Sequence, residues 1–101
     1  MAYDLIVRPD AELDLVDAFE WYEEKRTGLG HDFLIQIDAG LKHIKRTPNA
    51  HAIIYQSARI HLIKRFPYKI IYLVKEEKII VLGVIHASRN TTLIKKRTKG
   101  D

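Results

Sequence analysis

Residues 59–86 read RIHLIKRFPYKIIYLVKEEKIIVLGVIH, and this stretch decides the fold that the chain is expected to adopt. Pro67 and the pair Glu76-Glu77 divide it into three runs rich in β-branched and aromatic residues, which predict strands at 59–66, 68–74 and 78–86. The connections are too short for crossovers, so the three strands should form an antiparallel meander. The last run is apolar almost throughout, which indicates a strand buried on both faces.

The first half of the chain predicts a short strand followed by two amphipathic helices. The strand occupies residues 3–7. Apolar residues then recur at helical spacing over about residues 10–25, with Asp10 as the expected N-cap, and again over about residues 30–46. Glycines between the two stretches break the helical pattern, so the helices should form a hairpin.

These elements give the order β-α-α-β-β-β, an α+β fold. The first strand must join the sheet, because its backbone groups would otherwise stay unpaired. We expect the helical hairpin to pack on one face of a mostly antiparallel, twisted sheet, and the other face to be partly open to a ligand or partner. Residues 49–58 fit either a loop or a short strand. The single domain should span residues 1–89, and residues 90–101 should form a flexible basic C-terminal tail.

Composition excludes several classes of protein. The chain has no cysteine, which rules out disulfides, cysteine-ligated zinc and thiol catalysis and fits a reducing cytoplasm. The five histidines show no metal-binding spacing such as HExxH, so neither a metal nor another cofactor is expected. The longest apolar stretch, residues 79–85, is far shorter than the roughly 20 residues of a membrane helix. No secretory signal pattern is found near the N-terminus, and we expect a cytoplasmic protein.

The net charge of +4 is unevenly distributed along the chain. Residues 1–50 hold 10 acidic and 6 basic residues, which gives −4, whereas residues 51–101 hold 3 acidic and 11 basic residues, which gives +8. A positive second half is typical of proteins that bind nucleic acid, ribosomal RNA or an acidic protein. A solvated sheet edge with a basic tail would give the same pattern.

The basic residues of the second half are the candidate contacts for phosphate or for an acidic partner: Arg59, His61, Lys64, Arg65, Lys69 and Arg89. If they converge, they could bind phosphate through charge-assisted hydrogen bonds; if not, they are ordinary exposed sheet residues. Strand alternation puts Arg59, His61 and Arg65 on one face, but it does not decide whether Arg65 and Lys69 converge.

His86 closes the third strand and could act as an acid or base near neutral pH. The favoured interpretation is a strand-end histidine that hydrogen-bonds the backbone. On the first helix, Trp21 lies a quarter-turn from the apolar stripe and is expected to pack in the core at the margin between the helices. Leu13 and Val16 face away from the stripe and could seat a partner helix or a second copy of the chain.

Residues along most of the chain carry a family resemblance: Ala11, Asp14-Leu15, Ala18 and Trp21-Tyr22, then Gly28-Leu29-Gly30 and Phe33, then Ile44 and Pro48, then RFPYKIIY at 65–72, VLGVIH at 81–86 and Arg89. The segment at 65–72 is the most specific of these. In this order and spacing, over about residues 3–89, the sequence resembles the RelE/ParE toxin superfamily, and the ParE branch most closely.

The resemblance implies a RelE/ParE-like sheet with a helical hairpin packed on it. It also implies a type II toxin–antitoxin system, in which a cognate antitoxin wraps the toxin with a flexible segment. A homodimer and a toxin–antitoxin heterotetramer are both open. ParE-like members block DNA gyrase and are not known to need a catalytic set, which is the leading expectation here and makes the chain an inhibitor rather than an enzyme.

The alternative is a RelE-like endoribonuclease that cleaves mRNA on the ribosome. Such members use basic residues on the sheet and, in many, a tyrosine in the C-terminal segment, and the matching set here is Lys69, His86 and Arg89. The last tyrosine is Tyr72, so that tyrosine has no counterpart. The ParE branch often continues after Arg89 with Pro and an aromatic residue, whereas this chain continues with Asn-Thr-Thr-Leu. A third hypothesis for the function is a basic module that binds nucleic acid and is not toxic.

Overall fold

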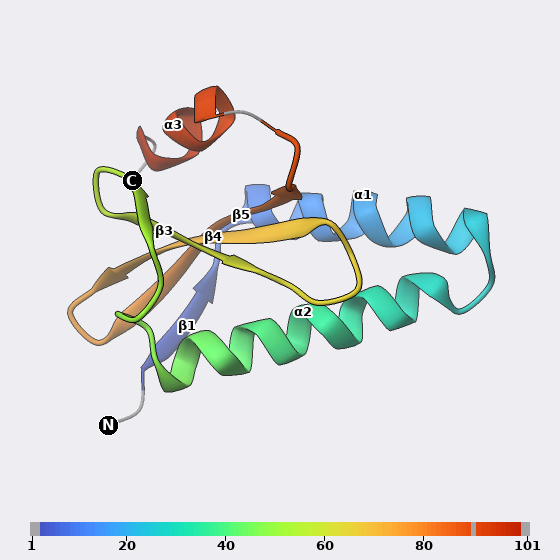
Figure 1. The fold of residues 1–101 in the computed structure, drawn as a ribbon, viewed down its shortest axis with the longest axis horizontal. Helices are drawn as coiled ribbons and strands as arrows, with labels where there is room; N and C mark the ends of the chain where they lie inside the picture. The colour runs from blue at the N-terminus through green and yellow to red at the C-terminus, as the bar shows by residue number, and fades with distance from the viewer. Residues whose placement is uncertain (1–2, 90, 100–101) are drawn as a thin grey trace.

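The computed structural model describes residues 3–89 and 91–99. Its five-stranded sheet has the order β1-β5-β4-β3-β2 (Figure 1). The elements follow one another as β1 (Asp4–Val7), α1 (Pro9–Lys25), α2 (Leu29–Arg46), β2 (Ile53–Tyr55), β3 (Ala58–Leu62), β4 (Tyr68–Lys75), β5 (Lys78–His86) and α3 (Thr91–Lys99). The expected α+β fold, with a helical hairpin on a mostly antiparallel sheet, is confirmed.

The strand pairing follows the sequence prediction. The β3, β4 and β5 strands pair as consecutive antiparallel neighbours, and β1 joins the edge of β5 in parallel. The segment left open by the sequence contains β2, which pairs with β3. The first predicted run was too long, because β3 ends at Leu62. After it, Arg65 adopts a left-handed backbone with φ +71° and Phe66 turns into the core, so residues 63–67 form the connection.

The hairpin between α1 and α2 depends on Glu23. Gly28 has φ +91°, a backbone conformation that residues with a side chain rarely adopt, and α2 begins directly after it. The Glu23 carboxylate accepts the backbone N–H groups of Gly28 (3.0 Å) and Gly30 (2.8 Å), so α1 caps the start of α2. The Gly28 N–H, followed by that of Gly30, holds the pKa of the Glu23 carboxyl below its ordinary value.

The start of α1 differs from the prediction that Asp10 is the N-cap. The N-cap is Arg8, whose side chain makes no capping hydrogen bond to the helix. Pro9 occupies the first turn, where its fixed φ suits the helix and its missing N–H costs nothing. Asp10 lies inside that turn as one of its acidic residues, where it favours the positive end of the helix.

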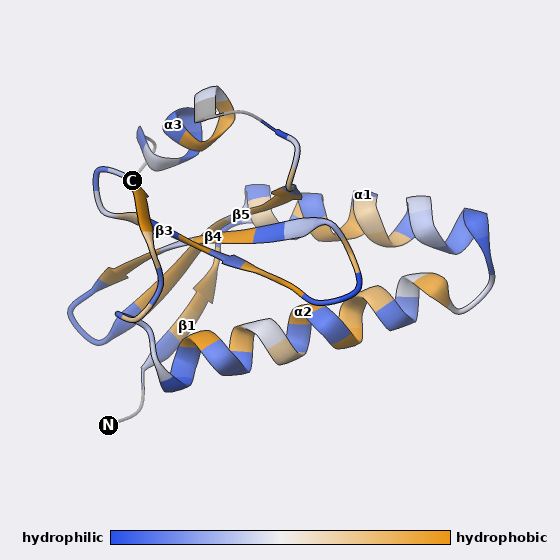
Figure 2. Ribbon diagram, in the orientation of Figure 1, coloured by the Kyte–Doolittle hydropathy of each residue, from blue (hydrophilic) through white to orange (hydrophobic). Residues whose placement is uncertain are grey.

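The main core lies between the helical hairpin and the sheet. Figure 2 shows that the central strands are mostly hydrophobic, whereas α1 and α2 alternate between hydrophilic and hydrophobic residues. Phe33, Ile37 and Ile44 of α2 are buried against the sheet, and aromatic rings fill the end near the hairpin turn. Tyr72 is fully buried, and its hydroxyl donates to the Pro48 carbonyl at 2.7 Å. Burial raises the pKa of that hydroxyl to about 12.

The expectation of a flexible basic tail does not describe residues 91–99, which form α3. Ile94 is 1% exposed and packs in a second cluster with Ile71, Leu73, Leu82 and Ile85, on the sheet face that was expected to be open. Thr98 is also buried, and its hydroxyl donates to the Ile94 carbonyl. This short apolar stripe lets a basic segment pack as a helix. Residues 90, 100 and 101 of the predicted tail lie outside the described residues.

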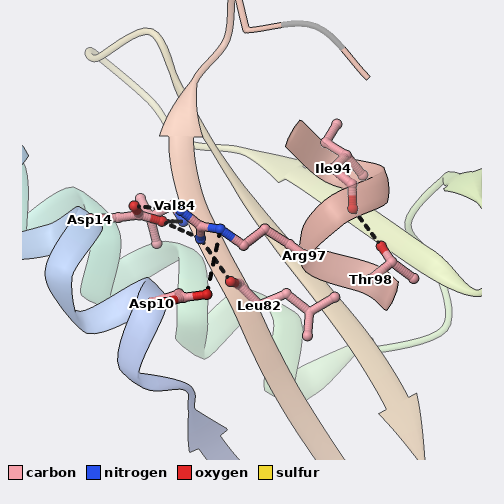
Figure 3. Close-up of polar contacts among 7 residues, drawn as sticks. All are labelled: Asp10, Asp14, Leu82, Val84, Ile94, Arg97 and Thr98. Carbon is pink, nitrogen blue, oxygen red and sulfur yellow. Dashed lines mark hydrogen bonds and ion pairs between the residues drawn. The ribbon is translucent and has the colours of Figure 1, made fainter. Parts of the chain in front are cut away.

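An ion pair joins α3 to α1 across β5. The Arg97 guanidinium donates to both carboxylate oxygens of Asp14 at 2.8 and 3.0 Å (Figure 3). The same guanidinium donates to the Leu82 carbonyl, and Asp14 accepts the Val84 N–H at 2.9 Å. The hydrogen bonds to Asp14 raise the pKa of Arg97 above its ordinary value. Two backbone groups of β5 that lie beyond the end of β1 therefore have side-chain partners.

A bulge in β5 makes room for this pair. Ile71 is paired with Gly83 and Tyr72 with Val81, so Leu82 is an extra residue in the strand. A side chain at Gly83 would place its Cβ 2.7 Å from Arg97 Nη1. Glycine at this position therefore permits the close approach of the guanidinium.

Within residues 3–89 and 91–99, the structure contains no helix with the length and apolar character that crossing a bilayer requires.

We expect Arg97→Ala to lower the free energy of unfolding by about 2–4 kcal/mol. The substitution removes the ion-pair partner of the Asp14 carboxylate and the hydrogen-bond donor to the Leu82 carbonyl, both in a partly buried site. Denaturant unfolding at neutral pH measures the change. Lys96→Ala, on the same turn but exposed, is the control and should stay within about 0.5 kcal/mol of the unsubstituted protein. Equal values for the two variants would contradict the role given to Arg97.

Candidate functional site

A groove of about 590 Å³ lies between α1, the C-terminal part of β5 and α3. It sits beside the part of β5 that β1 leaves without a strand neighbour, since β1 pairs only as far as Val81. The lining side chains come from four parts of the chain: Asp14, Asp17, Ala18, Trp21 and Tyr22 from α1; Pro67 and Tyr68; Val84, Ile85, His86 and Arg89; and Leu93 and Arg97 from α3.

Aromatic side chains form one wall of the groove. Trp21 is 54% exposed, so the prediction that it packs in the core is wrong. Its neighbour Tyr22 takes the core position against Phe33 and Phe66, which leaves Trp21 on the rim with Lys25 Nζ 4.6 Å from its ring. Tyr68 also lines the groove, and its ring meets the His86 ring edge-on, with 5.4 Å between the ring centroids. An exposed indole on the rim of a concave site suits binding to a partner.

The two phenols in the groove are neutral hydroxyls at physiological pH. Burial, and then the charge of Asp14, raises the pKa of Tyr68 above its ordinary value. Burial, and then Tyr68, raises the pKa of Tyr22 in the same way. Both groups can therefore donate hydrogen bonds, and neither is a ready base.

The sequence-predicted RNase set lies around one end of the groove. His86 and Arg89 line it, and Lys69 lies nearby on β4. The Lys69 ammonium, however, donates to the carbonyls of Ala87 (3.4 Å) and Arg89 (3.2 Å), so it holds the turn after β5. The Ser88 backbone N–H donates to His86 Nδ1 at 3.1 Å. His86 thus has the backbone hydrogen bond expected of a strand-end histidine.

The other basic candidates do not converge with this set. Arg59 donates to the Asn49 and His51 carbonyls and fixes the segment before β2. Arg65 forms an exposed ion pair with Asp32 at 3.6 Å, and Lys64 is exposed in the same connection. His61 lies under α2 beside two other histidines. The basic second half of the chain therefore does not form one phosphate-binding cluster in the part that the structure describes.

Leu13 and Val16 are 62% and 50% exposed on α1, as the sequence predicted. They lie one turn apart on the same helix, so both can contact one partner.

Sequence reasoning missed three features: the groove itself, the Asp14–Arg97 pair and a cluster of histidines. Leu93, Ile94, Arg97 and Thr98 recur at helical spacing, and this pattern was the available signal for α3. The histidines at 43, 51 and 61 match no motif, because they meet only through the fold.

Comparison with known proteins gives a consistent result. A family model described as the ParE toxin of the type II toxin–antitoxin system parDE matches residues 5–91. A solved structure of the chromosomal ParDE system from P. aeruginosa aligns with a TM-score of 0.75 at 18% identity, covering 84% of this chain and 96% of that chain. A mutant of the E. coli toxin RelE in the free state aligns with a TM-score of 0.66 at 15% identity, covering 99% and 98%. A search of curated protein sequences gave no significant match.

We expect Lys69→Ala to lower the free energy of unfolding by about 1–3 kcal/mol, because it removes two hydrogen bonds, from the ammonium to the carbonyls of Ala87 and Arg89, and one such bond typically contributes about 0.5–1.5 kcal/mol. Hydrogen exchange should also show faster exchange at residues 87–89. Lys64→Ala removes an exposed lysine of the neighbouring connection and should change neither quantity. The structural role of Lys69 fails if both variants behave alike.

Proposed function

The chain belongs to the ParE toxin family of type II toxin–antitoxin systems, and we propose that it arrests growth by binding DNA gyrase and is neutralised by a cognate antitoxin. A toxin of this kind acts by occupying a surface of its target, so it needs contact residues and no acid–base pair. The observation that carries the proposal is the state of Lys69, whose ammonium is bonded to backbone carbonyls and so does not face a substrate in the groove.

The groove between α1 and α3 is the proposed gyrase-binding site. Trp21 and Arg89 are both exposed at its margin, and Trp and Arg are the residues that most often dominate binding energy at interfaces. The neutral hydroxyl of Tyr68 adds a hydrogen-bonding group inside it.

The outer side of α1 is the proposed antitoxin-binding surface. Leu13 and Val16 are exposed apolar side chains on one face of the helix, which suits a segment that buries its own apolar residues against them. Because the two partners would bind different surfaces, a substitution on the outer side of α1 should affect antitoxin binding without affecting gyrase binding.

Purified protein should inhibit DNA supercoiling by gyrase, and Trp21→Ala should raise the concentration needed by at least about 30-fold, the equivalent of one interface hot spot. Ile35→Ala is the matched control, since Ile35 is similarly exposed but lies on α2. Leu13→Asp should leave inhibition intact and weaken antitoxin binding. Normal supercoiling in the presence of saturating, folded protein would refute the gyrase proposal.

A RelE-like ribosome-dependent endoribonuclease is the second candidate. It is favoured by one observation: His86 and Arg89 line the same groove, so a proton-transfer group and a positive charge could face one phosphate.

This second candidate predicts mRNA cleavage in a translation extract. Loss of the acid or base in His86→Gln should slow the cleavage by about 10²–10⁴-fold, and Arg89→Ala should weaken it as well. Intact mRNA after incubation with the unsubstituted, folded protein would exclude the RNase, whatever the supercoiling assay shows.

A further inference from the structure

Three histidines from separate parts of the chain meet beside the sheet. His43 lies in the last turn of α2, His51 lies in the segment before β2, and His61 is the last residue but one of β3. One ring nitrogen of each lies within 4.8 Å of those of the other two. The ring centroids are 4.8–5.1 Å apart, and the rings of His43 and His61 are stacked. The three side chains therefore present their nitrogens to one small volume.

The polar atoms of this cluster are incompletely satisfied. His61 Nδ1 and His51 Nε2 lie 2.9 Å apart and share one hydrogen bond. His51 Nδ1 is buried and has no hydrogen-bond partner, although the Thr47 backbone lies close enough to favour the protonated ring. His51 Nε2 is the nitrogen that faces the cluster, so Nδ1 would lie opposite the ligand atom. In a metal-bound histidine, the nitrogen opposite the ligand atom commonly donates to a backbone carbonyl, as Nδ1 could to Thr47.

The surroundings favour neutral imidazoles. Burial, and then the neighbouring His51 and His43, lowers the pKa of His61 to about 4. Burial, and then His43, lowers the pKa of His51 as well. Neutral imidazole is the form in which histidine binds a metal ion.

We propose that His43, His51 and His61 form a binding site for Zn²⁺, with three imidazole nitrogens as ligands and a water molecule in the fourth position. The donor set selects this class of ion, because imidazole suits Zn²⁺ and its transition-metal neighbours, whereas Mg²⁺ and Ca²⁺ require oxygen ligands. No carboxylate belongs to the cluster among the described residues.

Small side-chain movements complete the geometry. Tetrahedral Zn²⁺ with bonds of about 2.0–2.1 Å places its ligand nitrogens about 3.3 Å apart. The His51–His61 pair at 2.9 Å must open slightly, and His43 must move inward. His43 is exposed at the helix end, so its ring is the one best able to move.

The bound ion would fasten the segment before β2 to α2 and β3. In the structure, Arg59 holds that segment by donating to the Asn49 and His51 carbonyls, Tyr72 by donating to Pro48, and the Ile60 N–H by donating to the Ala52 carbonyl. None of the three histidines lines the groove between α1 and α3, so the metal site does not depend on the proposed toxic activity.

The test uses untagged, metal-stripped full-length protein and Zn²⁺ in competition with a fluorescent chelator. We expect one ion per chain. At about 100 times Kd, Zn²⁺ should raise Tm by about 10 °C in a domain of this size. Co²⁺ should give the visible absorption of a tetrahedral site. His43→Gln should weaken binding by at least about 100-fold, since even the loss of a group outside the ligand set costs about 10–100-fold.

His31→Gln is the control, because His31 is exposed and lies outside the cluster. Zn²⁺ binding by His61→Gln is a second measurement, but this substitution alters a half-buried side chain and could impair folding. The His43→Gln variant, whose side chain is exposed, is therefore the decisive one. Absence of Zn²⁺ uptake by the unsubstituted protein would overturn the proposal, and so would undiminished uptake by folded His43→Gln.

Discussion

The C-terminal part of β5 has backbone groups that no strand can satisfy, and the rest of the structure is arranged around this constraint. The β1 strand reaches only to Val81, whereas β5 continues to His86. Asp14 and Arg97 supply the missing partners to Val84 and Leu82 and also pair with each other. A buried ion pair adds little net stability compared with apolar packing, but breaking one is costly, so the pair fixes the positions of α1 and α3.

The candidate functional site follows from the same constraint. Because side chains rather than a strand close this edge, α1 and α3 are held apart over the end of β5 and a groove remains between them. The groove presents aromatic rings and Arg89, while Lys69 is engaged by the backbone. This distribution favours recognition of a protein surface over chemistry on a phosphate, since the Lys69 ammonium is bonded to backbone carbonyls and not directed into the groove.

The order and pairing of the elements could be predicted because they are encoded locally. The β-branched runs at 68–74 and 78–86, with the turn at Glu76-Glu77, define adjacent strands in any context. The helix α3 could not be predicted from its composition, because its formation depends on burial of Ile94 and on a pair between residues 14 and 97. Trp21 was misplaced for a similar reason: its exposure depends on Tyr22 filling the core against Phe33 and Phe66.

These long-range polar contacts have a common physical origin in the size of the chain. A chain of 101 residues buries a smaller fraction of its surface than a large domain does, and this one has no cysteine for a disulfide. Its peripheral segments are instead attached by specific polar groups: α3 by Arg97, the turn after β5 by Lys69, and the segment before β2 by Arg59 and Tyr72. The three histidines belong to that last segment and its neighbours, so an ion bound there would strengthen an attachment that the protein already makes.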